Sequence, residues 1–379
     1  MKAMTLLTCV LAFALGCIAW EQPGDPLGSA STPVTIHVPG DFPTNREGML
    51  AASDGDTVLV APGEYYEQIN FSGKEIVLAS HYVLNQEFDL IQNTIIDGFD
   101  QQYEDTASCV LFVSGEGNGA ELVGFTLRGG TGTHWVDPQY PDWTWHSGGG
   151  IFIFQASPTI RNNIIADNHV NDPLGADGAS GGGICTYGGN PVIINNIIQN
   201  NTALYGAGVV IDYSGCLFTN NIVAGNSGGQ SYGGAAFWTI GNGEWPILIE
   251  NNTVVNNEAL PPGKAGAMYL WSSDVVARNN IFRGNTQPEG GPIFLTGGAT
   301  LDLTYSNIEG GYDGEGNIDA DPLFADTSFL LSSGSPCIDA GNPDVLYNDR
   351  EDPGFPGSAL WPSFGGLTND MGVYGGSNC

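Results

Sequence analysis

The chain has 379 residues, of which 56 are glycine and only 13% are charged. The abundant glycine argues against an ordinary helical enzyme and favours an all-β fold. The 9 lysine and arginine residues face 41 aspartate and glutamate residues. The resulting formal net charge of -32 repels nucleic acid and anionic lipid, so we expect neither as a partner.

Residues 1–19 read as a secretory signal peptide, because Lys2 precedes an apolar run that ends in small residues before Trp20. We expect an exported bacterial protein, secreted or held at the outer cell surface, with a linker over residues 20–33. Cys17 follows "ALG", which loosely resembles a lipobox, so lipid anchoring through Cys17 and simple cleavage near Ala19 both stay open. No later apolar run is long enough for a transmembrane segment.

The segment after the linker predicts the start of a solenoid. Residues 45–52 form an amphipathic stretch, which we expect to be a short helix that covers the open end of the stack. The sequence "DGDTVLVAPGEYYE" from residue 54 then alternates in the way that half-buried strands do.

A unit of 25 to 33 residues recurs through the middle of the chain. It is clearest in "GGGIFIFQASPTIRNNIIADN" from residue 148 and "GGGICTYGGNPVIINNIIQNN" from residue 181. Short β-branched runs separated by glycine or asparagine predict three strands and three turns in each copy. Each copy has an asparagine pair, and a further asparagine follows five residues after its second member. The second members of the pairs are Asn163, Asn196, Asn221, Asn252 and Asn280, with Asn307 as a further copy.

These repeats predict a single-stranded right-handed parallel β-helix of about nine or ten coils over residues 34–321. An irregular C-terminal cap is expected over residues 322–379. Asparagines stacked at a tight turn can hydrogen-bond from coil to coil, and asparagine tolerates the left-handed backbone that such a turn requires.

The opening segment "DGDTVLVAPGEYYE" and the "GGGI" and "NNI" units resemble the first coils and repeats of secreted pectin-lyase-like parallel β-helix proteins. Near the end, "GNIDADPLF", "GSPCIDAGNP" and "DMGVYGG" resemble the segment that precedes a sorting or anchoring tail in exported bacterial β-helix proteins. The resemblance implies the fold. It leaves the function open, because the same architecture serves lyases, hydrolases, isomerases and adhesins.

Strand parity after the glycine triplets predicts which side chains face outward. Ile151, Ile184, Val209, Met268 and Ile293 are expected to point inward, and their successors outward. The expected outward row is Phe152, Cys185, Val210, Phe237, Tyr269 and Phe294. Its aromatic rings can stack on the apolar faces of sugar rings, so Phe152, Phe237 and Tyr269 are candidate glycan-binding residues. The alternative is ordinary surface covered by loops.

The stretch "THWVDPQYPDWTWH" over residues 133–146 immediately precedes the first triplet and predicts a long loop beside this face. Trp135, Trp143 and Trp145 can form the wall of a binding cleft. Its hydrogen-bonding partners for sugar hydroxyls are expected to be Asp137, Asp142, His134 and His146. The alternatives are that the tryptophans only hold the loop on the solenoid, or that the histidines and nearby aspartates bind a metal.

A catalytic centre is not recognisable from motifs. The family resemblance implies either an arginine or lysine base with Ca²⁺, as in lyases, or clustered aspartates, as in hydrolases, and neither set is evident. Asp212 is the one carboxylate in the expected first strands. Glycoside hydrolysis needs a second carboxylate, which Asp167, Asp172 or Asp177 in a neighbouring loop could supply.

A calcium site is a further hypothesis. Oxygen-bearing side chains alternate in "DGEGNIDAD", at Asp313, Glu315, Asn317, Asp319 and Asp321, and such a pattern can wrap a hard cation. The alternative is a structural turn. Of the cysteines outside the signal segment, Cys337 and Cys379 are the pair that we consider first for a disulfide.

Together these features predict an exported protein that binds extracellular polysaccharide, and degrades it if it is an enzyme, through the first-strand face and the loop over residues 130–147. A catalytic version would be a polysaccharide lyase or a glycoside hydrolase. The competing hypothesis is a non-enzymatic cell-surface adhesin or structural protein, because "FRGN" at residues 282–285 also resembles the repeats of polymorphic outer-membrane proteins.

Overall fold

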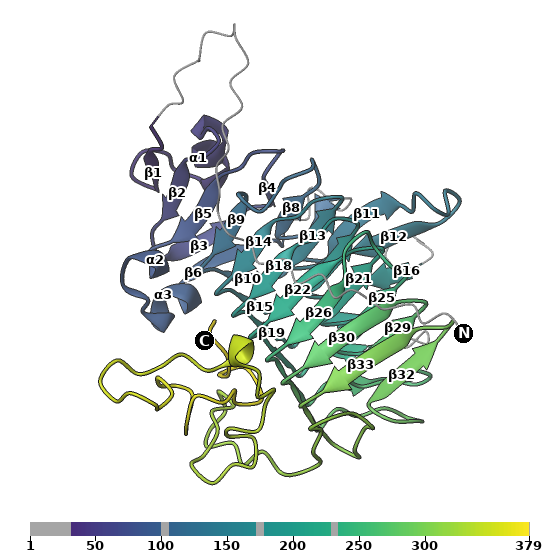
Figure 1. Cartoon of the computed structure of the whole chain (residues 1–379). Helices are drawn as coiled ribbons and strands as arrows, with labels where there is room; N and C mark the ends of the chain where they lie inside the picture. The colour runs from purple at the N-terminus through teal and green to yellow at the C-terminus, as the bar shows by residue number, and fades with distance from the viewer. Residues whose placement is uncertain (1–31, 100–105, 172–177, 229–233, 379) are drawn as a thin grey trace, which may run out of the picture. The chain divides into compact units, whose positions relative to one another are not determined.

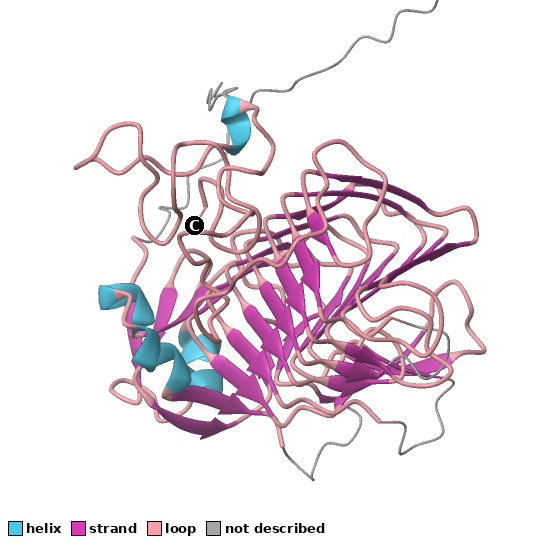
Figure 2. Ribbon diagram, turned by 90° about the horizontal axis from the view of Figure 1, so that it is seen from below, coloured by secondary structure: helices cyan, strands magenta, loops and turns pink. Residues whose placement is uncertain are grey.

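The computed structural model describes residues 32–99, 106–171, 178–228 and 234–378. The expected signal peptide, most of the linker, Cys17 and Cys379 lie outside these residues. The described chain is dominated by strands, with helices only at a few places (Figures 1 and 2). It therefore has the expected all-β architecture.

Three long parallel sheets run along the solenoid, and each coil contributes one strand to each of them (Figure 1). The first-strand sheet contains β4 (Ile69–Asn70), β8 (Val110–Phe112), β13 (Ile151–Phe154), β17 (Ile184–Tyr187), β21 (Val209–Asp212), β25 (Phe237–Ile240), β29 (Met268–Trp271) and β32 (Ile293–Thr296).

The second-strand sheet has ten strands among the described residues, in agreement with the nine or ten coils expected. It contains β1 (Thr35–Val38), β2 (Thr57–Val60), β5 (Val77–Ser80), β9 (Glu121–Val123), β14 (Thr159–Arg161), β18 (Val192–Ile194), β22 (Cys216–Thr219), β26 (Ile247–Glu250), β30 (Asp274–Arg278) and β33 (Thr300–Thr304).

The third-strand sheet contains β3 (Gly63–Tyr66), β6 (Thr94–Asp97), β10 (Thr126–Arg128), β15 (Ile164–Ala166), β19 (Ile197–Gln199), β23 (Ile222–Ala224), β27 (Thr253–Val255), β31 (Ile281–Arg283) and β34 (Asn307–Ile308). A small sheet beside it contains β20 (Thr202–Ala203), β24 (Ser227–Gly228) and β28 (Glu258–Ala259). The helices are α1 (Asn45–Ala51), α2 (Tyr82–Asn85) and α3 (Phe88–Gln92), with a 3₁₀ turn, η1, at Val345–Tyr347.

The interior is a continuous apolar core formed by one side of all three long sheets. Successive strands pair in register, so Ile151, Ile184 and Val209 stack on one another inside the coil, as parity predicts. The next residue of this inward row is Phe237, which pairs with Val209 and Met268 and is fully buried. The prediction that Phe237 faces outward is therefore wrong, and Trp238 occupies the outward position.

The glycine triplets explain this shift of one residue. Gly148 has a φ of +67°, and a Cβ on Gly150 would lie 2.6 Å from the carbonyl oxygen of Gly183 in the next coil. The first position needs a left-handed backbone and the third lies against the neighbouring coil. In the later coil the same three positions are held by Gly234, Ala235 and Ala236, since Val209, which follows the triplet at residues 206–208, pairs with Phe237. Counting the triplet from Gly233 places every following side chain on the wrong face.

Two rows of buried asparagines run from coil to coil, as predicted. In the first row the Nδ2 of Asn196 donates to Asn221 Oδ1 at 3.0 Å and to the carbonyl oxygens of Ile160 and Ile194 at 2.9 and 3.0 Å. The row contains Asn163, Asn196, Asn221, Asn252 and Asn280, and the second row contains Asn168, Asn201, Asn226, Asn257 and Asn285.

Asn307 does not continue the first row. The backbone amide of Asn280 donates to Ser306 Oγ at 3.0 Å, so a hydroxyl takes the place of the amide in the last coil. Asn307 lies one residue later, in β34, and its Nδ2 donates to the sulfur of Cys337. Because the serine hydroxyl can accept the same hydrogen bond as an asparagine side chain, a search for asparagine alone places the end of the row at the wrong residue.

The first asparagine of each pair has a different role from the second. Asn162, Asn195, Asn220, Asn251 and Asn279 all have a left-handed φ, between +52° and +59°. Four of their side chains reach the irregular C-terminal segment: Asn195 donates to Asn378, Asn220 to Val373 and Gly375, and Asn251 to Asn369, while Asn279 accepts from the amide of Asn342.

The C-terminal segment after residue 322 contains η1 but no strand among the residues described, and it lies against the outer side of the third-strand sheet (Figure 1). Val373 packs on Ile222 and Val255, and Met371 packs with Ile281. The segment therefore covers the side of several coils. Cys337 in this segment is a buried thiol, and its expected partner Cys379 lies outside the described residues.

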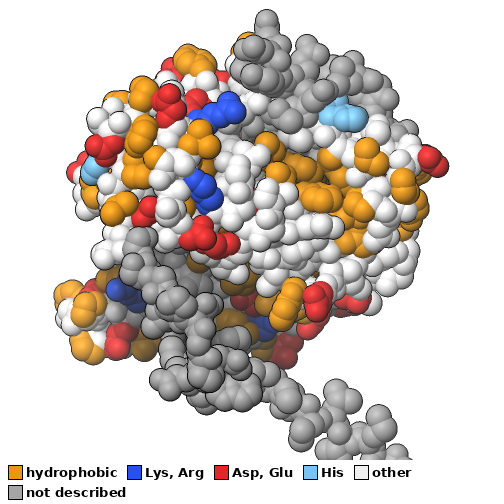
Figure 3. Space-filling model, turned by 90° about the horizontal axis from the view of Figure 1, so that it is seen from above, with side chains coloured by type: hydrophobic (Ala, Val, Ile, Leu, Met, Phe, Trp, Pro, Cys, Tyr) orange, Lys and Arg blue, Asp and Glu red, His pale blue; other side chains and the backbone are white. Residues whose placement is uncertain are grey.

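Charged residues are confined largely to the surface. On the face drawn in Figure 3, basic side chains are few and lie apart from a group of hydrophobic side chains. Several of the basic residues pair with acids along the sheets: Arg128 with Glu64 and Asp97, Arg161 with Glu121, and Arg278 with Glu250. Within the described residues, no helix has the length and apolar character needed to cross a membrane.

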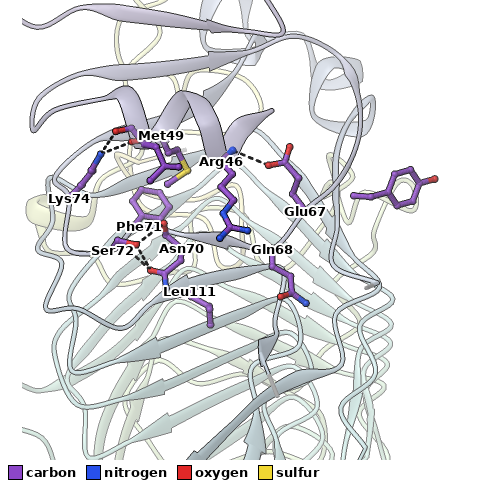
Figure 4. A pocket seen from close by; sticks show the side chains of 11 residues that line it. Arg46, Met49, Glu67, Gln68, Asn70, Phe71, Ser72, Lys74 and Leu111 are labelled. Carbon is purple, nitrogen blue, oxygen red and sulfur yellow. Dashed lines mark hydrogen bonds between the residues drawn. The ribbon is translucent and has the colours of Figure 1, made fainter. Parts of the chain in front are cut away.

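Helix α1 covers the N-terminal end and is held at both ends by charged side chains (Figure 4). The Glu67 carboxylate accepts hydrogen bonds from the amides of Asn45 and Arg46, and Lys74 Nζ donates to the carbonyl oxygens of Met49 and Ala52 at 2.7 Å. These contacts complement the partial charges at the two helix ends. The expected short helix at residues 45–52 is confirmed.

Replacing an asparagine in the middle of the first row is expected to destabilise the solenoid strongly. Asn221→Ala removes the oxygen that accepts from Asn196 and the amide that donates to Ile193 and Thr219. Because these groups are buried, we expect a loss of about 3 kcal/mol in the free energy of unfolding. Urea denaturation followed by circular dichroism measures it. Substitution of the exposed Asn118 by alanine is the control, and equal effects of the two substitutions would contradict the proposed role of the row.

Candidate functional site

The tryptophan-rich stretch is a β-hairpin rather than an irregular loop. Strand β11 (Gly132–Val136) pairs antiparallel with β12 (Thr144–Ser147). The hairpin joins a four-stranded sheet in which β11 pairs with β7 (Thr106–Ala107) and β12 with β16 (Gly178–Ser180). These pairings hold the hairpin rigidly beside the first-strand sheet.

Trp135 and Trp145 are directly opposite each other in the hairpin and both face the first-strand sheet. The Trp135 ring lies 5.7 Å from Phe152 and 5.0 Å from Tyr187, measured between ring centroids, and its Nε1 donates to Ser147 Oγ. The Trp145 ring packs against Trp238 on the solenoid. Both tryptophans therefore attach the hairpin to the solenoid through ring contacts.

A pocket of about 570 Å³ lies between the hairpin and the ends of strands β21, β25 and β29. This volume is within the range of ligand-binding sites. Nine of its lining residues are tryptophan or tyrosine, and we call it the aromatic pocket. It is lined by Trp135, Asp137, Tyr140, Trp143, Trp145, Tyr205, Asp212, Tyr213, Trp238, Ile240, Gly241, Tyr269, Trp271 and Ser272.

The pocket has buried and exposed aromatic parts. Trp238 is buried and stacks on Tyr205 with ring centroids 4.6 Å apart. Trp143 is 50% exposed and Trp271 46% exposed, and Trp143 lies beside Tyr140 in the hairpin turn. Apolar ring faces are thus available to a ligand from solvent.

The structure brings together six of the predicted site residues, all of which line the aromatic pocket: Trp135, Asp137, Trp143, Trp145, Tyr269 and Asp212. It does not bring the others into it. Alternate residues of a strand point to opposite faces, so His134 and His146, which neighbour the two inward-facing tryptophans, lie on the other side of the hairpin.

Phe152 and Phe237 do not line the pocket either. Phe152 faces outward as predicted, but it is only 2% exposed because Trp135 covers it. Phe237 lies in the interior, where its ring contacts Phe218 edge to face. The aromatic row is therefore covered surface over much of its length, as the alternative interpretation held, and Trp238 and Tyr269 line the pocket although both are buried.

Two buried carboxyl groups line the pocket. Asp212 ends strand β21 and is 8% exposed, and Asp137 begins the hairpin turn and is 6% exposed. Asp137 Oδ1 accepts a hydrogen bond from the amide of Gln139 at 2.8 Å and another from the hydroxyl of Tyr187 at 3.3 Å. The turn and the first-strand sheet together fix the Asp137 carboxylate.

The environment of Asp212 favours its neutral form. Burial raises the pKa of Asp212 well above its ordinary value, and the negative charge of Asp137 raises this pKa further, while a backbone hydrogen bond with Ile240 opposes the shift. Unequal environments for two neighbouring carboxyl groups are the arrangement that acid–base catalysis uses. Burial, together with Asp137, also raises the pKa of the Tyr187 hydroxyl, which therefore keeps the proton that it donates.

Three buried polar atoms of the pocket residues have no hydrogen-bond partner among the described residues. They are Oδ1 of Asp212 and the indole Nε1 atoms of Trp145 and Trp238. Buried polar atoms are normally satisfied, so unsatisfied ones in a pocket indicate a place where a ligand or water completes the bonding.

The expected partners of Asp212 do not occupy this position. Asp167 is exposed at an asparagine turn and does not line the pocket, and Asp172 and Asp177 lie outside the described residues. The carboxyl partner is Asp137, which is 75 residues earlier in the chain. Asp137 was predicted as a hydrogen-bonding residue of the loop, but the repeats do not indicate it as the partner of Asp212, because it belongs to the hairpin rather than to a coil.

The predicted calcium ligands are engaged separately. Asn317 donates to the carbonyl of Leu303, Asp319 pairs with Arg283, and Asp321 accepts from the amide of Leu323. Asp313 and Glu315 are exposed, and a hydrogen bond with Glu315 is the main cause that raises the pKa of Tyr305. Across the described residues, no three His, Cys, Asp or Glu side chains gather in a way that could hold a metal ion.

Sequence reasoning missed several pocket residues. Trp238 was one position away from the predicted outward row, and aligning "GAAF" with "GAGV" would have found it. Tyr205 lies in the short spacer after Asn201, and Tyr213 follows Asp212 with a left-handed φ of +46°. Neither tyrosine carries a motif that marks it as part of a site.

Comparison with known proteins supports the fold. The model of a family described as "Right handed beta helix region" matches residues 141–286. No curated protein sequence gives a significant match.

Two solved structures are similar at low sequence identity. One is a pectin methylesterase variant in complex with a hexasaccharide, with a TM-score of 0.41 and 10% identity over 80% of this chain and 98% of that chain. The other is a pectate lyase, with a TM-score of 0.42 and 15% identity over 92% of this chain and 97% of that chain. The strand topology and the family match together identify the solenoid as a right-handed parallel β-helix.

Proposed function

We propose that this protein binds an extracellular polysaccharide in the aromatic pocket and hydrolyses it with Asp212 and Asp137. One observation carries the proposal: a pocket lined by tryptophan and tyrosine holds two buried carboxyl groups, of which one has an oxygen without a partner among the described residues. The signal-like segment at residues 1–19 supports export, and Cys17 is the position at which a lipid anchor would be attached.

Aromatic rings and free hydrogen-bonding atoms suit a sugar chain. The exposed faces of Trp143 and Trp271 can stack on the C–H faces of sugar rings. The indole N–H groups of Trp145 and Trp238 can donate to hydroxyl oxygens. These contacts orient a chain across the ends of strands β21, β25 and β29.

The carboxyl pair supplies the two groups that glycoside hydrolysis requires. Asp212, whose pKa burial raises well above its ordinary value, donates its proton to the glycosidic oxygen as the bond to the leaving sugar breaks. Asp137, held by Tyr187 and Gln139, acts on the other side of the bond as base or nucleophile, and water is added to the sugar.

The lining residues favour hydrolysis over elimination. A lyase removes a proton beside a uronate carboxylate and needs positive charge to stabilise the product of that step. The described lining residues include no lysine, arginine or histidine that could supply it. They do include the acid pair.

A screen of polysaccharides with three variants tests the proposal. Asp212→Asn is expected to lower turnover at least about 100-fold while binding is retained, because the acid is lost but the shape is kept. Trp143→Ala is expected to weaken binding about tenfold through the loss of a stacking surface. Trp245→Ala removes an equally exposed tryptophan outside the pocket and serves as the control.

Isothermal titration calorimetry measures binding in this screen, and reducing-end analysis measures cleavage. New reducing ends without unsaturated sugars support hydrolysis. Glycan binding without any product would contradict the catalytic role and leave a binding module. If no glycan binds, the carbohydrate proposal is wrong and a surface adhesin or structural role replaces it.

The pKa of Asp212 also predicts how stability depends on pH. A carboxyl group with a raised pKa in the folded state binds its proton more tightly there than in the unfolded chain. Its contribution to stability is therefore fully present below the pKa of the unfolded group and is lost as the pH rises. Asp212→Asn is expected to raise the unfolding temperature by a few degrees at pH 8 and to leave it unchanged at pH 4. Differential scanning calorimetry checks this, and a stabilising effect that is equal at both pH values would refute it.

A further inference from the structure

The charge distribution around the aromatic pocket limits the kind of glycan that it can take. Asp137 and Asp212 line it, and none of the described lining residues is basic. Elsewhere, Lys74 binds the end of α1, and Arg128, Arg161 and Arg278 pair with acids on the sheets. The chain as a whole carries a formal net charge of -32. A polyanionic chain such as a polyuronate is repelled, whereas a cationic chain is attracted.

The unsatisfied Asp212 oxygen points to the same ligand chemistry. A protonated amine offers three N–H donors and a positive charge, which are the two things that a buried carboxyl group without a partner lacks. A neutral hydroxyl can donate one hydrogen bond but cannot balance the negative charge of Asp137.

The aromatic walls suit a cation as well as a sugar face. Rings of tryptophan and tyrosine attract a positively charged group that lies over them, and tryptophan is the strongest of the aromatic side chains in this respect. Trp238 and Tyr205 stack in the buried part of the pocket, and Trp145 lies beside Trp238. Amines and sugar rings can thus be bound by the same surface.

We propose that the glycan of the aromatic pocket is a chain of amino sugars with free, protonated amines, whose charge Asp137 recognises and whose N–H groups donate to the unpartnered oxygen of Asp212. This inference rests on the proposed function. It names the substrate class of the same site and separates it from N-acetylated, neutral and uronate chains.

Four hexasaccharides with β-1,4 or α-1,4 backbones provide the test: glucosamine, N-acetylglucosamine, glucose and galacturonic acid hexamers. The glucosamine and N-acetylglucosamine hexamers differ only in the charge and acetylation of the amine. Calorimetry at pH 6 on the full chain is expected to show at least about tenfold tighter binding of the glucosamine hexamer than of the N-acetylated and glucose hexamers, and no binding of the galacturonate. The preference is expected to shrink in 0.5 M NaCl, because salt screens charge.

Two variants connect this preference with the pocket. The double substitution Asp137→Asn with Asp212→Asn keeps the side-chain shapes and removes the negative charge of Asp137 together with the ionisable group of Asp212, so the glucosamine and N-acetylglucosamine hexamers are expected to bind about equally. Asp302→Asn, at an exposed position of β33, removes a charge outside the pocket and is expected to keep the preference. Circular dichroism confirms that each variant is folded.

The outcomes separate this inference from the proposed function. Equal or tighter binding of the glucose or N-acetylglucosamine hexamer overturns the amino-sugar inference and leaves polysaccharide binding in place. A preference that survives the double substitution also overturns it. Binding of choline without any hexamer identifies a small cation site and overturns both. If nothing binds, the proposed function fails, and the inference fails with it.

Discussion

The hydrogen bonds between stacked asparagines fix the position of each coil relative to the next. Each buried amide joins two coils through its oxygen and nitrogen and also satisfies carbonyl groups at the turn, as at Asn196. Because the spacing between successive asparagines varies between 25 and 33 residues, the coils differ in length. The rows nevertheless bring every first strand into register. Without that register, Asp212 would not share a row with Tyr187 and Trp271, and the pocket would not form.

The pocket is made where the regular solenoid meets an inserted element. The outward side chains of β21, β25 and β29 supply one wall, and the hairpin of β11 and β12 supplies the other. The solenoid is rigid and the hairpin is tied into its own small sheet, so neither wall needs to move to position the carboxyl pair. The loops differ in length from coil to coil without changing the fold. The long insertion that forms the hairpin is thus what provides a site.

The sequence repeats predicted most of the fold because they are local and periodic. They located the coils, both asparagine rows and the face on which the site lies, and the amphipathic stretch before them located the capping helix. The errors arose where a residue type could be exchanged without changing the structure. Alanine replaces glycine at positions 235 and 236, which moved Phe237 to the wrong face, and Ser306 replaces asparagine at the end of the first row.

The candidate site could be predicted only in part, because its chemistry depends on contacts between distant segments. The three tryptophans, Tyr269 and Asp212 were found from composition and parity. The pairing of Asp212 with Asp137 depends on how the hairpin folds over the sheet, and no repeat or motif encodes that distance. The same is true of the histidines, whose side of the hairpin follows from the register of β11 and β12.

The docking of the C-terminal segment changes how such a solenoid holds together. In a stack of repeats each coil contacts only its neighbours, so the ends can fray independently of the middle. Here the C-terminal segment forms hydrogen bonds with the turns of four consecutive coils, at Asn195, Asn220, Asn251 and Asn279. It therefore holds these four coils together. If any one of these coils unfolds, the segment also loses its contacts with the other three. We therefore expect the coils that carry β21, β25 and β29 to unfold together, and the residues of the pocket to keep their mutual positions until they do.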